Sequence, residues 1–465
     1  MPHPTRTGLI LLLAALPACQ DRPGPAIGAL PPAAQAVPGT SLLRLSRAGG
    51  VPRLLAGANL HDLGWRGRGR LPALQSVIGF DLDQSLAYAI DSTGALQALD
   101  LSTGTSRALA PAVRGAALGP DGTLWVVDPK DSILRIRRRF PERMSTVLPG
   151  SPVALYGTGD RQLIAIEGGD TARALVLAGA QEGVATDLPS TATAASPWGD
   201  LVAVAASSGV YLWAPRGGTP MRRVRMSGTP KVVRFSASGH RVYVGREDDG
   251  LGVIDRYAGE RLDDIGLPGA AERLRVAPYG GWLLARPAEG DSVWVVNLAT
   301  GRYAGAAESP WAVDLPTVVG EATLVVREGG DLVARDLGTE GFPEVGRVKG
   351  GATDLYLAVP WVPASVRQEQ AVASRDTARP APPDSFAATP APAAATLYLQ
   401  VSRSQNPAWA QALAGEIRAQ GFPALVLDPR QGEEAYRVVV GPYPSREAAE
   451  SAGRQLGRPS FIYQP

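Results

Sequence analysis

Cysteine and histidine are nearly absent from this chain of 465 residues. A single cysteine, Cys19, cannot form an intramolecular disulfide, and one thiol is too few for a cysteine-based metal cluster. Beside His3, the histidines are His61, in the stretch NLHDLGW, and His240, in an expected β-turn. Neither lies in a zinc-ligand or catalytic-triad motif. We therefore expect no metal site and no histidine-based catalysis.

Long apolar runs and blocks of positive charge are also missing. Beyond the first twenty residues no run reaches the ~18 apolar residues of a membrane span, so we expect no other crossing segment. Lysine and arginine number 46 against 44 aspartate and glutamate, which gives a net charge of only +2. Without a lysine-rich block the chain lacks the electrostatic footprint of nucleic-acid binding, and we expect no nucleic-acid partner.

Glycine and proline are abundant, at 54 and 41 residues, and they cluster. Residues 19–40 predict a flexible tether. Residues 362–395 lack periodicity and consist mainly of Ala, Pro and small polar residues, a composition that cannot bury enough apolar surface to fold. We expect a disordered linker there, spanning about 30 Å as a random coil. Two folded bodies remain, 41–361 and 396–465.

The residues before Cys19 indicate its use. Arg6, an apolar run from Leu9 to Leu16 and small residues after it have the layout of an export signal. The stretch LPAC resembles a bacterial lipoprotein lipobox, which implies a signal peptide at 1–18, cleavage before Cys19 and a diacylglycerol anchor on its sulfur. By the enterobacterial sorting rule, Gln20 in place of aspartate implies outer-membrane attachment, facing the periplasm. The alternative is an ordinary secreted protein with a chance cysteine.

A repeat of about 40 residues fills the first body, the period of four-stranded propeller blades. Each copy has a short strand, a polar or glycine turn, an apolar strand, a second turn and another apolar strand. Runs such as LWVV, LVAVAA and SVWVV suit central strands packed on both faces. The first turns of the seven copies lie at Gln84, Gly122, Gly159, Gly199, Gly239, Gly280 and Gly320.

The ends of this body predict ring closure. Residues 41–57 fit two outer strands joined by a Gly-Gly turn, and residues 352–360 fit an inner strand without outer partners. Together they would complete one shared blade and hide open strand edges. This leaves seven or eight blades. The turns DLSTG, DRYAG and NLATG resemble those of quinoprotein-like β-propeller repeats, a likeness limited to these turns and their neighbouring strands.

The propeller sequence carries no clear catalytic constellation. Asp128 with Asp131, and Asp248 with Asp249, could offer oxygen ligands to Ca²⁺, but aspartates in hairpin turns usually hydrogen-bond locally. We therefore expect a scaffold for a protein partner, without cofactor or catalytic residues. The alternatives are an enzyme acting on cell-wall or carbohydrate material and an assembly factor for outer-membrane proteins.

The pattern changes after residue 396 to strand, helix, strand, strand, helix, strand. Helix boundaries are marked by Asn406 with Pro407, by Gly421, by Ser445 and by Gly457. Apolar stripes at Ala410, Leu413, Ala414 and Ile417, and at Ala448, Ala449, Ala452 and Leu456, predict two helices covering one face of a four-stranded sheet. We expect a small α/β, ferredoxin-like βαββαβ domain with its other face open.

This tail resembles a SPOR domain, over all of 396–465. The resemblance rests on Gln400, on the helix end EIRAQGFPALV, on YRVVVGPY and on PSREAAESAGRQL. It implies binding to peptidoglycan glycan strands stripped of their stem peptides. The family usually has Val-Gly-Ser-Phe after the glutamine, whereas Val401–Ser404 read VSRS here, so the edge of the face differs.

Strand alternation sorts the side chains. It directs Leu397, Leu399, Val401, Tyr436, Val438 and Val440 towards the helices. The candidate glycan-binding residues on the open face are Tyr398, Gln400, Ser402, Arg437 and Val439, with Tyr443 at one rim. Aromatic rings stack on sugar C–H faces, and amide, hydroxyl and guanidinium groups satisfy sugar hydroxyls and N-acetyl carbonyls. No carboxylate pair with glycosidase spacing can be assigned, which favours binding without cleavage.

Overall fold

The computed structural model describes most of the two folded bodies. The described residues are 40–81, 84–137, 140–158, 161–169, 171–177, 184–215, 220–237, 239–248, 250–278, 281–320, 322–363, 397–404, 414–415, 417–418, 421–428, 436–456 and 460–463. The predicted signal peptide, Cys19, nearly all of the tether and most of the linker lie outside them. Within the described part, no helix has the length and apolar character needed to cross a bilayer.

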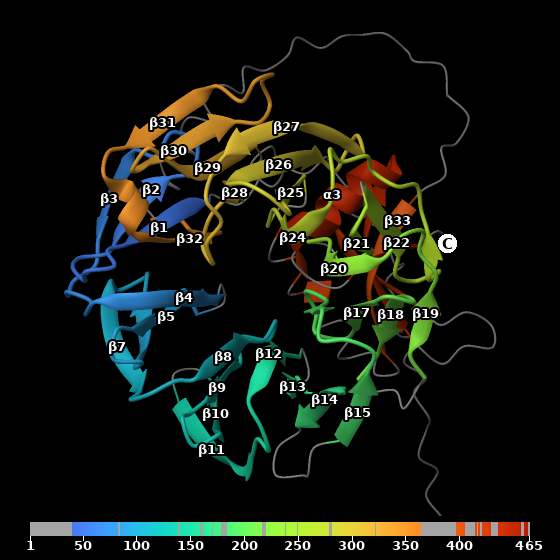
Figure 1. Ribbon diagram of the computed structural model, residues 1–465, viewed down its shortest axis with the longest axis horizontal. Coiled ribbons are helices and arrows are strands. Elements are labelled where there is room, and N and C mark those ends of the chain that lie inside the picture. The colour runs from blue at the N-terminus through green and yellow to red at the C-terminus, as the bar shows by residue number, and fades with distance from the viewer. Residues whose placement is uncertain are drawn as a thin grey trace, which may run out of the picture.

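The repeat forms a β-propeller. Seven four-stranded antiparallel sheets follow one another along the chain around a ring (Figure 1). The first four contain β4 (Leu74–Asp81), β5 (Leu86–Asp91), β6 (Leu96–Asp100) and β7 (Thr105–Ala110); β8 (Gly115–Leu118), β9 (Leu124–Val127), β10 (Ser132–Arg137) and β11 (Phe140–Val147); β12 (Pro152–Gly157), β13 (Leu163–Glu167), β14 (Ala172–Leu177) and β15 (Val184–Leu188); β16 (Thr193–Ala195), β17 (Val202–Ala206), β18 (Gly209–Trp213) and β19 (Arg222–Val224).

The next three blades complete the internal repeat. They contain β20 (Pro230–Phe235), β21 (Arg241–Arg246), β22 (Leu251–Asp255) and β23 (Glu260–Arg261); β24 (Ala271–Val276), β25 (Trp282–Pro287), β26 (Ser292–Asn297) and β27 (Arg302–Glu308); β28 (Thr317–Val319), β29 (Thr323–Glu328), β30 (Asp331–Asp336) and β31 (Glu344–Val348). Strands such as β9, β17 and β21, each the second of its blade, are buried along most of their length. Neighbouring blades share apolar clusters, as the continuous apolar runs predict.

An eighth sheet closes the ring. Its strand order is β3 (Asp62–Arg66), β2 (Arg53–Ala56), β1 (Ser41–Leu45) and β32 (Leu355–Val359). Strand β32 occupies the inner position and pairs with β1 from Ser41↔Val359 to Leu45↔Leu355. The predicted closure is confirmed, and the described residues form eight blades. Because three strands of this blade precede the first repeat and one follows the last, a count of repeats alone finds seven.

The turns recur with the same local chemistry. In the three predicted Asp/Asn-x-x-x-Gly turns, the side chain of Asp100, Asp255 or Asn297 accepts hydrogen bonds from two following backbone amides. The closing glycines have φ near +63 to +73°, a region that favours glycine. The carboxylate of Asp128 likewise accepts from the amides of Lys130 and Ser132, which is a turn function.

Side-chain hydrogen bonds also join neighbouring blades, between residues about one repeat apart in the sequence. Tyr156 on β12 donates its hydroxyl to the carbonyl of Thr193, 37 residues away, at 2.9 Å. Arg234 on β20 donates to the carbonyl of Leu274, 40 residues away, at 3.2 Å. Arg275 on β24 reaches the carbonyl of Pro316, 41 residues away. Each bond joins an inner strand to the next blade.

The C-terminal sheet is separate and has the order β34 (Ala424–Leu427), β35 (Tyr436–Tyr443), β33 (Leu397–Ser404) and β36 (Phe461–Tyr463). Helix α3 (Arg446–Leu456) lies on one face, capped by Ser445, whose hydroxyl accepts from the amide of Ala448 at 3.2 Å. Residues 414–415 and 417–418 are helical. The described elements agree with the predicted βαββαβ order.

Candidate glycan-binding site

The helix side of the C-terminal sheet is a packed core. Leu399, Val438 and Val440 are fully buried there against Ala449 and Leu456 of α3. Ala414, Ile417, Ala424 and Ala452 belong to the same cluster, and Val401, Phe422, Val426, Tyr443 and Ile462 pack against it. Alternation therefore assigns the two faces correctly for the central strands.

Backbone pairing aligns a row of residues across all four strands, and three of them define the opposite face. Val439 on β35 pairs with Leu425 on β34 and with Gln400 on β33, and Gln400 pairs with Phe461 on β36. Directly paired residues project to the same face of a sheet, so Leu425, Val439 and Gln400 share the face predicted for glycan. Next to the row, Tyr398 pairs with Tyr463.

The centre of this face is not open. Gln400 is 5% exposed, Arg437 7% and Val439 0%, so the expectation of a bare face is wrong at this point. The guanidinium of Arg437 lies over the ring of Tyr463, 5.4 Å from its centroid. Because Arg437 and Tyr463 lie on opposite sides of the Val439–Gln400 row, the arginine side chain crosses the row and contributes to its burial.

Two tyrosines meet at the other end of β35. Gly441 has φ +137°, and a Cβ atom there would lie 3.1 Å from Cδ1 of Tyr398 and 3.2 Å from Cδ2 of Tyr443. Tyr443, predicted at the rim, instead packs against the helix-side core, and burial raises its pKa to about 12. Tyr398 remains half-buried on the candidate face. Ser402 pairs with Val438 in the ladder.

Sequence reasoning missed Tyr463. Ile462 packs towards the helices, and alternation alone would have directed Tyr463 to the candidate face. The described face thus combines two tyrosine rings, one guanidinium and one amide. Rings with flanking hydrogen-bond donors are suited to sugar rings and to their hydroxyl and N-acetyl groups.

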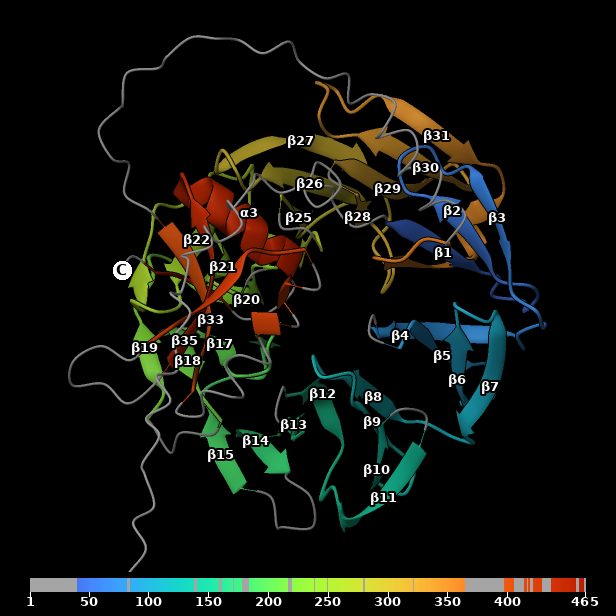
Figure 2. The same cartoon turned by 180° about the vertical axis from the view of Figure 1, so that it is seen from behind.

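The C-terminal sheet contacts the propeller through its helix side. Arg241 Nη2 on β21 is 3.9 Å from Glu450 Oε1 on α3, and His240 Nε2 donates to the carbonyl of Ser460. Burial lowers the pKa of His240, which favours the neutral imidazole. Figure 2, the view from behind, draws α3 and the C-terminal sheet over the blades that contain β17 to β26. The histidine that the sequence places in a β-turn therefore serves as an interdomain contact.

Comparison with known proteins agrees with both bodies. Residues 393–463 match the family model of the SPOR domain. No curated protein sequence is significantly similar to the chain. Among solved structures, the chain is similar to AztD from Citrobacter koseri, at 11% identity and a TM-score of 0.50, covering 69% of this chain and 97% of that one. At that identity the similarity shows the fold alone.

Two further solved structures are similar at lower TM-scores. The dihydro-heme d1 dehydrogenase NirN has a TM-score of 0.49 at 15% identity, covering 70% of this chain and 75% of that one. BamB from Moraxella catarrhalis has a TM-score of 0.41 at 18% identity, covering 63% of this chain and 90% of that one.

The fold defines a two-part protein, a β-propeller followed by a small sheet with helix α3 on one face. Its C-terminal domain is a SPOR domain, which implies a periplasmic protein that binds peptidoglycan.

Proposed function

We propose that this protein is an envelope lipoprotein that holds denuded peptidoglycan glycan strands through its SPOR domain and presents its propeller to a protein partner. Lipid on Cys19 would attach it to the outer membrane, on the periplasmic side. The observation that supports this most directly is the SPOR match at 393–463, together with the two tyrosines and the guanidinium on one face of that sheet. Denuded strands accumulate where the wall is being divided, so we propose a role in division or envelope maintenance.

In this proposal the ring of Tyr398 or Tyr463 stacks on a sugar C–H face. Arg437 moves off Tyr463 and donates to a hydroxyl or N-acetyl oxygen, and Gln400 pairs with a neighbouring polar group once uncovered. Val439 is the apolar floor of the row, and Tyr443 supports the face from the core side. Because the face is covered in the free structure, binding includes a side-chain rearrangement.

Sedimentation of the full chain with purified sacculi tests the proposal. Sacculi treated with an amidase, which removes stem peptides, should retain more protein than untreated sacculi. Tyr463→Ala and Arg437→Gln should each reduce retention about tenfold, since each removes a face contact worth roughly 1.4 kcal/mol. Tyr303→Ala, at a half-exposed tyrosine of the propeller, is the matched control and should bind normally.

Two outcomes would contradict this function. Equal retention by treated and untreated sacculi would remove the preference for denuded strands. Normal binding by both face variants would show that the glycan-binding site lies elsewhere. Metabolic labelling with a fatty acid tests the lipid anchor separately, and Cys19→Ser should abolish labelling of the protein.

The propeller is proposed as a binding scaffold, with cell-wall or carbohydrate chemistry as the alternative. A pocket bordered by inner strands of the propeller carries three arginines and a single carboxylate among its charged residues. That composition suits recognition of a negatively charged ligand better than acid–base hydrolysis, which needs paired carboxylates.

A further inference from the structure

The inner strands of four consecutive blades border an open cavity. It has a volume of about 960 Å³ and is bordered by β12, β16, β20 and β24 and by the segment before β28. Residues 232–237 and 272–278 line it without interruption. Because side chains on a strand alternate between faces, an uninterrupted run means that the backbone edge of the strand faces the cavity. Each of these four strands is the edge strand of its sheet.

The cavity is positively charged. Its charged lining residues are Arg234, Arg273, Arg275 and Glu272. Within the described residues none of the three arginines forms an ion pair, whereas Glu272 lies 3.9 Å from Arg286. In the described residues Arg234 donates hydrogen bonds to the backbone carbonyls of Leu274 and Val233. Arg275 donates to the backbone carbonyls of Ala312, Val313 and Pro316. Carbonyl partners satisfy the donors but leave the positive charge in place.

The neighbouring positive charges also affect the pKa of one arginine in the cavity. Burial first, and then repulsion from Arg234, Arg273 and Arg327, lowers the pKa of Arg275 to about 10, although Asp314 opposes the effect. An anion in the cavity would relieve this repulsion, and anions bound by guanidinium groups gain strong charge-assisted hydrogen bonds.

Apolar groups surround the arginines. Trp311 lines the cavity beneath the guanidinium of Arg275, 5.4 Å from it, and donates its indole N–H to the carbonyl of Ser292. Val153, 58% exposed, also lines it. A small inorganic anion would leave these apolar surfaces unused.

We propose that this cavity binds an extended acidic peptide segment of a partner protein. The carboxylates of the segment pair with Arg234 and Arg273, its apolar side chains contact Trp311 and Val153, and its backbone pairs with an exposed strand edge. Main-chain pairing with an edge strand, with specificity from alternate side chains, is a common mode of peptide recognition. This inference rests on the proposed scaffold role of the propeller and names the chemistry of the partner.

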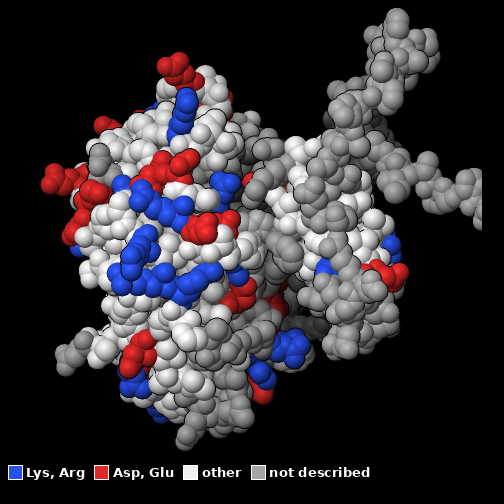
Figure 3. Space-filling model, turned by 90° about the vertical axis from the view of Figure 1, so that its right-hand side faces the viewer, with Lys and Arg blue, Asp and Glu red and all other residues white. Residues whose placement is uncertain are grey.

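The basic outer rim does not fit this role as well. Figure 3, which turns the right-hand side of Figure 1 to the viewer, shows Lys and Arg side chains gathered on that face, with Asp and Glu side chains beside them. Strand β19 there carries the exposed Arg222 and Arg223. Both donate to backbone carbonyls, Arg223 to that of Ser208. No described pocket is lined by either residue. Arg223 therefore provides a matched control, with the same kind of bonding outside the cavity.

Fluorescence anisotropy of the full chain tests the proposal. The probe is a fluorophore-labelled octapeptide of alternating glutamate and valine, compared with the same peptide carrying lysine in place of glutamate. The acidic peptide should bind, with an affinity that falls as salt rises, and the lysine peptide should not. Arg273→Gln, at a residue with no side-chain hydrogen bond among those described, should weaken binding about tenfold, as should Arg234→Gln. Arg223→Gln should leave it unchanged.

The outcomes distinguish failure of the cavity proposal from failure of the wall-binding proposal. Absence of binding at millimolar acidic peptide, equal binding of both peptides, or normal binding by Arg273→Gln would overturn the inference. Displacement by inorganic tripolyphosphate with no response to the acidic peptide would also overturn it, in favour of a small-anion site. Sacculus sedimentation of the same variants should stay normal, because the SPOR face is elsewhere. A loss there would point to misfolding or to failure of the wall-binding proposal.

Discussion

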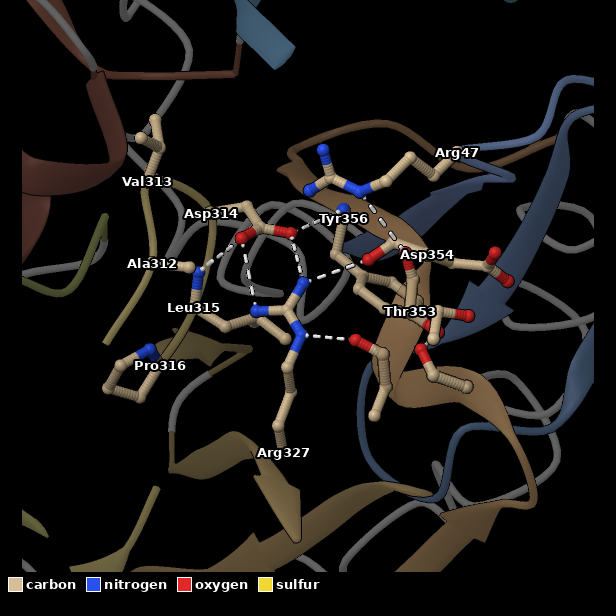
Figure 4. Close-up of polar contacts among 12 residues, drawn as sticks. Arg47, Ala312, Val313, Asp314, Leu315, Pro316, Arg327, Thr353, Asp354 and Tyr356 are labelled. Atoms are coloured by element: carbon tan, nitrogen blue, oxygen red, sulfur yellow. Dashed lines mark hydrogen bonds and ion pairs between the residues drawn. The ribbon is translucent and has the colours of Figure 1, made fainter. Parts of the chain in front are cut away.

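Arg327 and Asp314 form a bidentate ion pair, with Nη2–Oδ2 at 2.6 Å and Nη1–Oδ1 at 3.1 Å, at the junction between the last repeat and the closing blade (Figure 4). The same guanidinium donates to the carbonyls of Ala352 and Asp354, and Asp314 accepts from the amide of Tyr356 at 3.0 Å. The two side chains are only 11% and 2% exposed. The pair therefore fixes β32 against the blade that precedes it.

Breaking this pair should destabilise the ring. Arg327→Met leaves the Asp314 carboxylate buried without its main partner, and we expect a loss of about 3–5 kcal/mol in the free energy of unfolding. Urea unfolding followed by tryptophan fluorescence measures it. Lys231→Gln, which removes the half-exposed pair with Glu247, is the control and should be close to neutral. Equal losses in the free energy of unfolding for both variants would show that burial does not make the Arg327–Asp314 pair more important for stability than an exposed pair.

Glycines in equivalent repeat turns should differ in their tolerance of a side chain. Gly239 and Gly320 have φ of +71° and +59°, so alanine costs about 1–2 kcal/mol of backbone strain at either. A Cβ at Gly239 would also lie 2.7 Å from Nε1 of Trp198, whereas at Gly320 it meets nothing within 4 Å. Gly239→Ala should therefore lower the thermal midpoint more than Gly320→Ala. The opposite order would refute the packing of Trp198 against this turn.

The SPOR domain offers a similar pair. A Cβ at Gly441 would press on Tyr398, Tyr443 and the Leu397 carbonyl at 3.1–3.2 Å, with φ at +137°. Gly441→Ala should therefore destabilise the sheet and reduce sacculus binding. Gly415 is helical with open space at its Cβ, so Gly415→Ala should stabilise the domain by up to about 1 kcal/mol and leave binding unchanged. Equal stability of the two variants would contradict the tight contact at Gly441.

Tyr443 should make the domain sensitive to alkali. Burial raises its pKa to about 12 in the folded state, above the ordinary value near 10. A raised folded pKa contributes stability that is complete below pH 10 and is lost as the pH rises from 10 to 12. Tyr443→Phe removes this loss. Its hydroxyl has no hydrogen-bond partner among the described residues, so the variant should be at least as stable as the parent at neutral pH.

Circular dichroism of both proteins in urea, at pH values from neutral to strongly alkaline, measures this effect. Parallel pH profiles for parent and variant would contradict the burial of the Tyr443 hydroxyl. Because Tyr356 in the propeller also has a pKa raised by burial, the difference between the two proteins is the informative quantity.

Local rules predicted much of this molecule. Turn glycines repeating about every 40 residues placed the blades, and the complementary strands at the two ends of the body predicted the shared blade. Four of the turn glycines, at 122, 199, 239 and 320, have φ between +59 and +73°. In the SPOR domain, period-two alternation separated Leu399 and Val438 from Gln400 and Val439.

The contacts made by long side chains could not be predicted from the sequence. Alternation assigns Arg437 to a face but does not say that its guanidinium reaches Tyr463 on β36 and crosses Gln400. Register shifts in the pairing of β33 with β35 also break strict alternation towards Tyr443, which explains its place in the core. The arginines of the inner cavity were missed because Arg234 and Arg275 belong to different blades and come together only when the ring closes.

The closing blade determines where mechanical load would enter the protein. Ser41, where the tether reaches β1, pairs with Val359 at the end of β32, and its hydroxyl donates to the carbonyl of Trp361 at 2.6 Å. In the proposed function, once the contacts of His240 and Arg241 with the C-terminal sheet have parted, tension between the membrane anchor and the wall-bound domain would act on the Ser41–Val359 pair and separate β1 from β32 pair by pair. The other seven blades would stay unstressed until that seam opened.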